Sequence, residues 1–487
     1  MTGDSTDDGG TSDSGSGSNG RDGPGRTPQE QPAQRNPAWH FTVVTSAFTL
    51  ATAYSPYTLG AAGWGLGSAF WAYSIGATWW SGVLIGRCVL DGRKRGVPST
   101  YPEMMRDAFG LPGFCFAAVM QVATYYMLCV ALLVNIANWL LLMQAIVRPE
   151  APAPGGAPLR LCLWQWIIVA GCVATLLAQV KTFRSVMPLA VVSAVSTLAR
   201  QGILYYQIGS QDLLSRCAPS FGGVTPQSAF NSLATTGFLF GGHGIFPEEM
   251  RELRRPESFF KALHWAYAIM VAVYLTNAYV AYAVWGDWVA GDVQFNWPLN
   301  RATLASAILS CVWALIGMAM SHVMMLSLVE QRIEACWRAR ASSEVAPPPC
   351  SAAVVRLARF SLRAAVVWSE VFFAVMLSGA GIENIQALVG ALGFPALTYY
   401  APFAAYWRLL AKRESAWLQV GFLLVGLSGT CLMIFGVYSS LAGIAEDMRT
   451  YSLFDTSKCS SSAILNVSSC SNPCHSAYGD GATCIAA

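Results

Sequence analysis

The sequence predicts an all-helical integral membrane protein with eleven membrane-spanning helices. Of its 487 residues, 54% are hydrophobic and only 12% are charged, whereas roughly a quarter of the residues in a soluble protein are charged. The hydrophobic residues fall into long runs, and many of these reach the about 20 residues that a helix needs to cross a bilayer. This composition excludes an ordinary cytosolic enzyme, a nucleic-acid-binding protein and a disordered protein.

The apolar segments follow one another between two polar ends. They lie near residues 41–65, 67–90, 112–146, 161–180, 185–208, 228–249, 262–286, 302–331, 357–379, 384–408 and 416–443. Most of the 30 lysines and arginines fall in alternate loops, and such basic loops face the cytosol. The N-terminus is therefore predicted to be cytosolic, and the odd number of spans places the C-terminus on the extracellular or lumenal side.

The two ends differ from the transmembrane domain predicted for residues 39–445. Residues 1–38 are rich in glycine, serine, aspartate and proline, so they are predicted to form a disordered cytosolic tail. Residues 446–487 form a second polar tail with a glycosylation sequon at Asn466 and four cysteines: Cys459, Cys470, Cys474 and Cys484. The spacing favours two disulfides of open connectivity over a zinc site. Both modifications require the extracellular or lumenal side.

Two of the predicted spans are interrupted at matching positions. In the first span, Pro56 follows Tyr54 and precedes several glycines, and the sixth span contains Gly241-Gly242-His243-Gly244. These spans are the first members of two successive sets of five. Paired interruptions of this kind indicate an inverted-repeat transporter with a binding site near the bilayer midplane. The alternative is that proline and glycine merely kink two ordinary membrane helices.

Several motifs resemble those of the amino acid/auxin permease family. Residues 56–64 (PYTLGAAGW) are similar to the family element LPYAFAQLGW, and residues 237–248 (GFLFGGHGIFPE) resemble its FAYGGHNVFPEIQ element. The run LVGAL at 388–392 resembles its tenth span. The resemblance covers about residues 39–445. The sequence departs from the family at Thr49 and Ala51, where glycines are usual.

The resemblance implies a ten-helix inverted-repeat core with broken helices 1 and 6, plus one added helix. It also implies transport of amino acids or a related carboxylate, often driven by protons. Unwinding at 51–55 and 240–243 would expose helix ends and backbone groups that suit a zwitterion. The predicted substrate-binding residues are Ala51, Thr52, Ala53, Tyr54, Tyr126, Phe238, Phe240, Gly241 and Gly242. Tyr125 is a further candidate to close the pocket, although aromatic residues also serve as packing.

Four ionisable residues lie inside predicted spans, where a charge is costly and often functional. Arg200, His243, His322 and Glu370 are therefore candidates for proton coupling. Histidine suits this role because its charge changes near physiological pH, but His243 would equally well hydrogen-bond freed backbone. Arg200 would act as a fixed positive charge at the place where sodium-coupled relatives bind a cation, an arrangement similar to a lysine in some sodium-independent members. The alternative for Arg200 is a structural pair with Glu370 or a backbone carbonyl.

No enzymatic motif, catalytic residue, metal site or cofactor site is predicted. The expected partners are a small amino acid, a proton or sodium ion, and the lipid bilayer, without nucleic acid. The leading hypothesis is a proton symporter working by alternating access. A non-transporting amino acid sensor on the same fold and a sodium-coupled transporter are the alternatives. The membrane is predicted to be the plasma membrane or an endomembrane.

Overall fold

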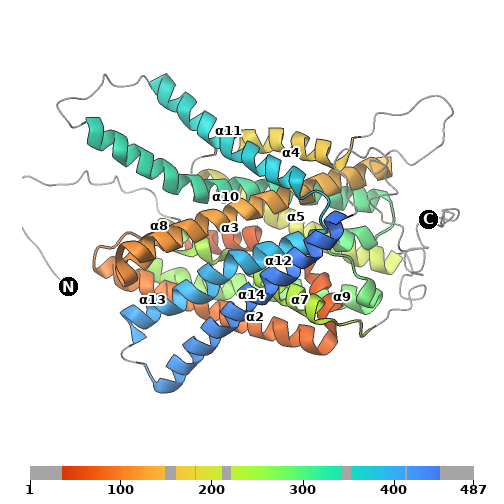
Figure 1. Cartoon of the computed structure of the whole chain (residues 1–487), viewed down its shortest axis with the longest axis horizontal. Helices are drawn as coiled ribbons and strands as arrows, with labels where there is room; N and C mark the ends of the chain where they lie inside the picture. Colours follow the sequence, from red (N-terminus) through yellow and green to blue (C-terminus); the bar gives the residue numbers. More distant parts are fainter. Residues whose placement is uncertain are drawn as a thin grey trace, which may run out of the picture. The chain divides into compact units, whose positions relative to one another are not determined.

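The computed structural model describes residues 36–147, 161–180, 183–210, 221–341, 352–411 and 414–449. The four cysteines of the predicted C-terminal tail and Asn466 lie outside the described residues. The described chain is helical, and Figure 1 shows its long helices running side by side. Six helical stretches, among them Tyr101–Val147 and Ala416–Arg449, have the length and apolar composition needed to cross a membrane. The prediction of an all-helical membrane protein with several long apolar helices is therefore confirmed.

The elements follow the order of the predicted apolar segments. The first set comprises α1 (Ala38–Thr49), η1 (Thr52–Tyr54), α2 (Ser55–Lys94), α3 (Tyr101–Val147), α4 (Leu163–Leu177) and α5 (Phe183–Ser210). The second comprises α7 (Pro226–Leu239), η2 (Gly242–Ile245), α8 (Phe246–Glu252), η3 (Pro256–Ser258), α9 (Phe259–Trp285), η4 (Gly286–Trp288), η5 (Val293–Asn296), α10 (Arg301–Ala341), α11 (Ala352–Met376), α12 (Ile382–Leu392), η6 (Ala396–Tyr400), α13 (Ala401–Leu409) and α14 (Ala416–Arg449).

Glycines divide two of the longest helices, α2 and α3. Gly63 has φ 71° within α2, and Gly110 has φ 69° within α3. Only glycine adopts this region readily, so each position bends the chain sharply. Gly63 separates the first predicted span from the second, slightly earlier than expected. Gly110 separates the helical residues 101–109, which lie between the second and third predicted spans, from the third span.

The interruptions lie among the most closely packed helices. α2 packs against α7 and α9, α10 packs against α3 and α5, and α12 packs against α7 and α14. Close approach depends on small residues. At Gly390 of α12, an added Cβ would collide with the backbone carbonyl of Ala234 in α7 and would lie 3.0 Å from Cβ of Phe238.

Substitution of Gly390 by alanine is expected to destabilise the protein by about 1–3 kcal/mol, the usual cost of overpacking. The backbone of α7 cannot yield as a flexible side chain would. Gly426→Ala is the matched control, because an added Cβ there meets nothing within 4 Å and alanine favours a helix. Thermal unfolding of both variants in detergent checks the prediction. Equal melting temperatures for the two variants would contradict it.

Candidate functional site

The interruption of the first span lies between α1 and η1. α1 ends at Thr49, Leu50 and Ala51 leave helical geometry, and Pro56 stands in the first turn of α2. Tyr274 of α9 stabilises the freed backbone. Its hydroxyl accepts a hydrogen bond from the Ala51 N–H at 3.0 Å and lies against the Thr49 carbonyl.

The second interruption lies between α7 and α8, and it meets the first. α7 ends at Leu239, whose carbonyl is 3.1 Å from the same Tyr274 hydroxyl. An added Cβ at Gly242 would lie 2.8 Å from Cγ2 of Thr49, and one at Gly241 would strike the ring of Phe394. Glycine is therefore required where the two interrupted segments touch. One tyrosine of α9 connects the ends of both helices.

Asn277, one turn beyond Tyr274 on α9, holds the next part of the first interruption. Its amide nitrogen donates to the Thr52 carbonyl and to the Ser55 hydroxyl, the latter at 2.8 Å. Sequence reasoning missed both Tyr274 and Asn277. The available signal was a tyrosine and an asparagine three residues apart in the seventh predicted span, on one face of a helix. Because of these two residues, backbone groups of Ala51 and Thr52 that were predicted to face a zwitterion have side-chain partners in this structure.

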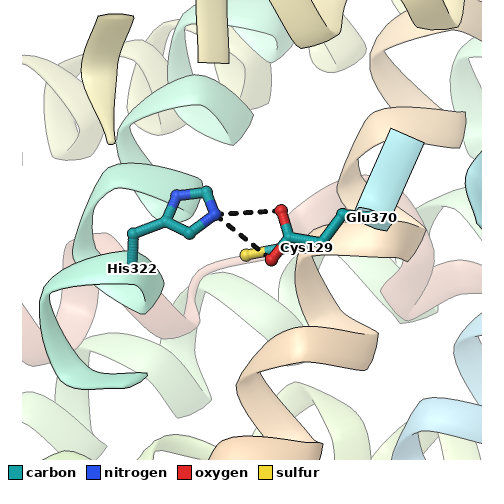
Figure 2. A group of neighbouring side chains, drawn as sticks. All are labelled: Cys129, His322 and Glu370. Atoms are coloured by element: carbon teal, nitrogen blue, oxygen red, sulfur yellow. Dashed lines mark hydrogen bonds and ion pairs between the residues drawn. The ribbon is translucent and has the colours of Figure 1, made fainter. Parts of the chain in front are cut away.

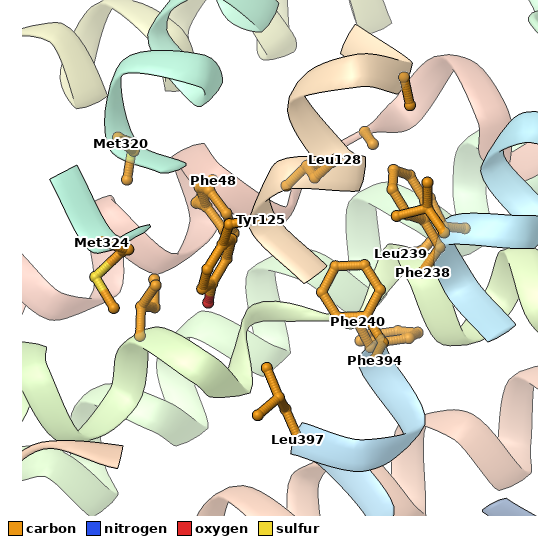
Figure 3. Close-up of a cluster of buried hydrophobic side chains, with 14 of the residues drawn as sticks. Phe48, Tyr125, Leu128, Phe238, Leu239, Phe240, Met320, Met324, Phe394 and Leu397 are labelled. Atoms are coloured by element: carbon orange, nitrogen blue, oxygen red, sulfur yellow. The ribbon is translucent and has the colours of Figure 1, made fainter. Parts of the chain in front are cut away.

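Aromatic side chains surround the second interruption. The rings of Tyr54 and Phe238 lie 6.3 Å apart, and those of Phe238 and Phe394 lie 5.8 Å apart. Phe240 stacks on Tyr267 with ring centroids 5.9 Å apart. Figure 3 shows Phe238, Phe240 and Phe394 gathered at this point. Phe238 and Phe240 thus lie beside the second interruption, packed against other aromatic rings.

The two tyrosines of α3 face different neighbours. Tyr125 is buried beside Phe48, with ring centroids 6.0 Å apart (Figure 3). An added Cβ at Gly244, next to the second interruption, would lie 2.5 Å from the Tyr125 hydroxyl. Tyr126 instead donates to Ser369 of α11 at 2.9 Å. The structure therefore brings Tyr125 to the interruption and does not bring Tyr126 there.

His243 is fully buried and makes contacts through both ring nitrogens. Nε2 lies 2.8 Å from the Thr78 carbonyl of α2, and Nδ1 lies 3.3 Å from the Thr398 hydroxyl of η6. Because a carbonyl only accepts, Nε2 carries the hydrogen in the bond to Thr78. These contacts tie η2 to two other elements, as the structural alternative for His243 requires.

Arg200 lies on α5 and is only 3% exposed. Its guanidinium donates to Ser310 of α10 at 3.1 Å and to Thr197 at 3.2 Å, and it lies 5.2 Å from the ring centroid of Trp313. It lines a small cavity of about 10 Å³, about the room that one water molecule needs, whose lining includes Thr52, Ala53, Arg200, Asn277, Gln294 and Trp297. The positive charge of Arg200 is thus placed beside the first interruption.

Glu370 pairs with His322, and the Arg200–Glu370 pair considered from the sequence does not form. Nε2 of His322 lies 2.9 and 3.2 Å from the two carboxylate oxygens of Glu370, and both side chains are buried (Figure 2). Cys129 of α3 lies beside them, with the donor atoms of all three within 4.8 Å of one another. A histidine, a thiol and a carboxylate are ligands that zinc accepts. In this structure Nε2 of His322 is hydrogen-bonded to the carboxylate, and this pair joins α10 to α11.

The helical fold and the interrupted helices define a multi-pass membrane transporter. The family described as "Transmembrane amino acid transporter protein" matches residues 38–445 of the chain. The chain belongs to this family, the amino acid/auxin permease family, which is a family of amino acid transporters and not of enzymes.

Similar proteins of one plant match this chain over different lengths. Amino acid permease 4 of Arabidopsis thaliana is 23% identical over 85% of this chain and 93% of its own. GABA transporter 1 of the same plant is 22% identical over 85% and 92%. Amino acid transporter AVT1B, also from that plant, is 23% identical, but the match covers 45% of this chain and only 38% of that protein.

Two solved structures can be compared with the chain. A manganese transporter mutant of Eremococcus coleocola aligns with a TM-score of 0.50 and 13% identity over 88% of this chain and 91% of that one. MhsT in complex with L-phenylalanine aligns with a TM-score of 0.47 and 14% identity over 83% and 98%. At 13% identity, the likeness to the manganese transporter concerns the fold alone.

Proposed function

We propose that this amino acid transporter is a proton symporter that works by alternating access. Its core would consist of two inverted sets of five spans, with the first and sixth spans broken and an eleventh added. The amino acid would bind beside the two interruptions. The observation that carries the coupling proposal is the buried guanidinium of Arg200 next to Thr52 and Ala53.

A fixed cation at this place disfavours sodium binding in the same cavity. Two like charges a few ångströms apart repel strongly where water is excluded. Arginine stays protonated in proteins, so Arg200 itself does not carry the transported proton. It supplies a constant positive charge that suits the carboxylate of an amino acid. A separate titratable group must then bind the proton.

The substrate site is proposed at the cavity beside η1, where the freed backbone and side chains converge. Thr52 and Ala53 line it from the first interruption, and Asn277 lines it from α9. Ala51 and Tyr54, which flank Thr52 and Ala53 in the chain, would complete the site. Phe238, Phe240, Gly241 and Gly242 would act from the second interruption. The hydrogen bonds of Tyr274 and Asn277 would hold the backbone in shape while the substrate binds and leaves.

The proposed orientation places the N-terminus in the cytosol and the C-terminus outside. Cys162, which immediately precedes α4, is disulfide-bonded. Disulfides persist on the extracellular or lumenal side, and the predicted topology assigns the connection between α3 and α4 to that side. The predicted cytosolic tail before α1, the predicted cysteine-rich tail after α14 with its disulfides, and the glycan at Asn466 belong to the same proposal.

The test is substrate-evoked current and uptake in a voltage-clamped cell expressing the full chain. Amino acids and an indole acid would be applied while external pH is stepped from 7.5 to 5.5 and sodium is replaced. We expect an inward current that grows at acidic pH and does not depend on sodium. A sodium-dependent current would contradict proton coupling. Binding without flux, with surface expression verified, would favour the sensor.

A further inference from the structure

Asp292 is a buried carboxylate in the connection between α9 and α10. Asp292 is only 1% exposed, although it lies between two apolar helical stretches and outside both of them. Oδ2 accepts a hydrogen bond from Nε1 of Trp139 at 2.6 Å, and Oδ1 accepts one from the backbone N–H of Gln294 at 2.9 Å. A buried carboxylate is costly, and the predicted topology assigns this connection to the outer side of the membrane.

A short hydrogen-bonded series of buried side chains connects Asp292 to Arg200. The amide nitrogen of Gln294 lies 3.4 Å from Oδ1 of Asp292 and donates to the Ser310 hydroxyl at 2.9 Å. The same Ser310 oxygen accepts from Arg200 at 3.1 Å. Two residues therefore bridge the carboxylate and the guanidinium, which form no direct ion pair among the described residues.

Two side chains of this hydrogen-bonded series, those of Gln294 and Arg200, each have one polar atom without a partner in the described part of the chain. Oε1 of Gln294 and Nε of Arg200 are buried without a hydrogen-bond partner among the described residues. Both residues line the cavity beside Thr52 and Ala53. Buried polar atoms without partners are unfavourable, so the cavity suits a polar occupant.

We propose that Asp292 is the outward-facing proton-binding group of this transporter, and that Arg200 couples its protonation to the binding of the substrate carboxylate. This inference rests on the proposed function. In the protonation step, a hydronium ion of the external solution gives its proton to a carboxylate oxygen of Asp292. One O–H bond of hydronium breaks, one O–H bond forms on the carboxyl group, and a water molecule is left. The loaded protein then carries one proton and one zwitterion.

The coupling follows from the charges. When Asp292 is ionised, its negative charge compensates Arg200 across a low-dielectric interior. When Asp292 is protonated, the positive charge of Arg200 is available to the substrate carboxylate. A bound carboxylate in turn favours a proton on Asp292, because linkage between two sites is reciprocal.

The surroundings of Asp292 are consistent with titration near neutral pH. Arg200 of α5 and the Tyr54 hydroxyl of η1 face it, Trp139 of α3 donates to it, and Cys311 of α10 lies close enough to interact with Arg200 and Tyr54. Tyrosine and cysteine are normally neutral at these pH values. Burial raises the pKa of Asp292 to about 6, against the opposing hydrogen bonds of Gln294 and Trp139 and the charge of Arg200. The group is therefore mostly ionised at pH 7.5 and mostly protonated at pH 5.5, so substrate affinity should rise as external pH falls.

Asp292→Asn tests the inference, because the amide keeps an oxygen for Trp139 but stays neutral. In wild type, the apparent substrate affinity should increase at least about fivefold between pH 7.5 and 5.5, the lower range of typical coupling. In Asp292→Asn, the affinity at pH 7.5 should already match that of wild type at pH 5.5. Substrate-evoked proton influx should be lost while substrate exchange across the membrane continues. A variant that keeps the wild-type pH dependence and proton influx would overturn the inference.

The matched control is Asp287→Asn, in the same connection between α9 and α10. Asp287 accepts hydrogen bonds from the backbone of Gly222 and Gly223, and its replacement should leave the pH dependence intact. If Asp292→Asn does not reach the membrane, Asp292→Glu decides, since it keeps a titratable carboxyl. A shifted midpoint of the pH dependence supports the inference, and an unchanged midpoint overturns it.

The same measurements separate this inference from the proposed function. Sodium-driven or pH-independent uptake by the wild-type chain would overturn proton symport itself, whatever the variants do. Proton-coupled uptake in wild type together with unchanged coupling in Asp292→Asn would leave symport standing and would remove only the role of Asp292.

Discussion

Replacing Arg200 with methionine is expected to reduce amino acid uptake by about 10- to 100-fold. A hydrogen bond to a charged group contributes about 1.5–3 kcal/mol, and each 1.4 kcal/mol changes affinity about tenfold. Methionine retains an apolar stem that can pack beside Trp313, but it removes the fixed positive charge next to Thr52 and Ala53. Radiolabelled uptake, normalised to the amount of protein at the membrane, measures the effect.

Two further variants test whether the effect of Arg200→Met comes from the loss of the positive charge. Arg200→Lys keeps a positive charge without the planar geometry, so it should retain part of the uptake and its dependence on pH. Arg301→Met makes the same replacement at an exposed position at the start of α10 and should transport like wild type. Normal uptake by Arg200→Met would show that the guanidinium serves packing alone.

Local sequence features predicted the class of fold and the places where its helices stop. Long apolar runs need no knowledge of partners to indicate membrane helices. Pro56 and the Gly241-Gly242 pair act on their own backbone, so their effect is also readable from the sequence. The structure accordingly ends α1 at Thr49 and α7 at Leu239.

Contacts between distant residues were not predictable in the same way. The bond from Ala51 to Tyr274 joins residues 223 positions apart, and it exists only because α1 packs against α9. Asp292 lies in a polar connection that sequence reasoning treated as a loop. Its burial depends on Trp139 and Gln294 closing over it, which no local pattern shows.

The contacts of Tyr126 and Glu370 differ from those that the sequence suggested. Both depend on which face of a helix meets its neighbour. Neighbouring residues of a helix point about 100° apart, so Tyr125 and Tyr126 cannot both face the same partner. The sequence offers no means of choosing between them until the packing of α3 is known. The partner of Glu370 depends likewise on the face of α11 that meets α10, where His322 lies.

Removing one member of the buried His322–Glu370 pair should destabilise the protein. For Glu370→Leu the expected loss is about 3–5 kcal/mol, the usual cost of breaking a buried pair. Nε2 of His322 would lose its partner, and Nδ1 already lacks one among the described residues. Glu370→Gln should cost less, because its amide oxygen still accepts from Nε2. Thermal unfolding of the purified full chain in detergent measures both effects. A Glu370→Leu variant as stable as wild type would contradict the prediction.

The double variant His322→Leu/Glu370→Leu separates a structural role of the pair from a role in coupling. Apolar replacement of both members of a buried pair is often nearly neutral for stability, so the double variant should recover most of what Glu370→Leu loses. If the pair only joins α10 to α11, the double variant should also transport with the pH dependence of wild type. Recovered stability with lost pH dependence would assign proton coupling to His322 and Glu370, and would place the proton between α10 and α11 rather than at Asp292. Because Asp292→Asn and this double variant alter separate clusters, comparing their pH profiles identifies which carboxylate carries the proton.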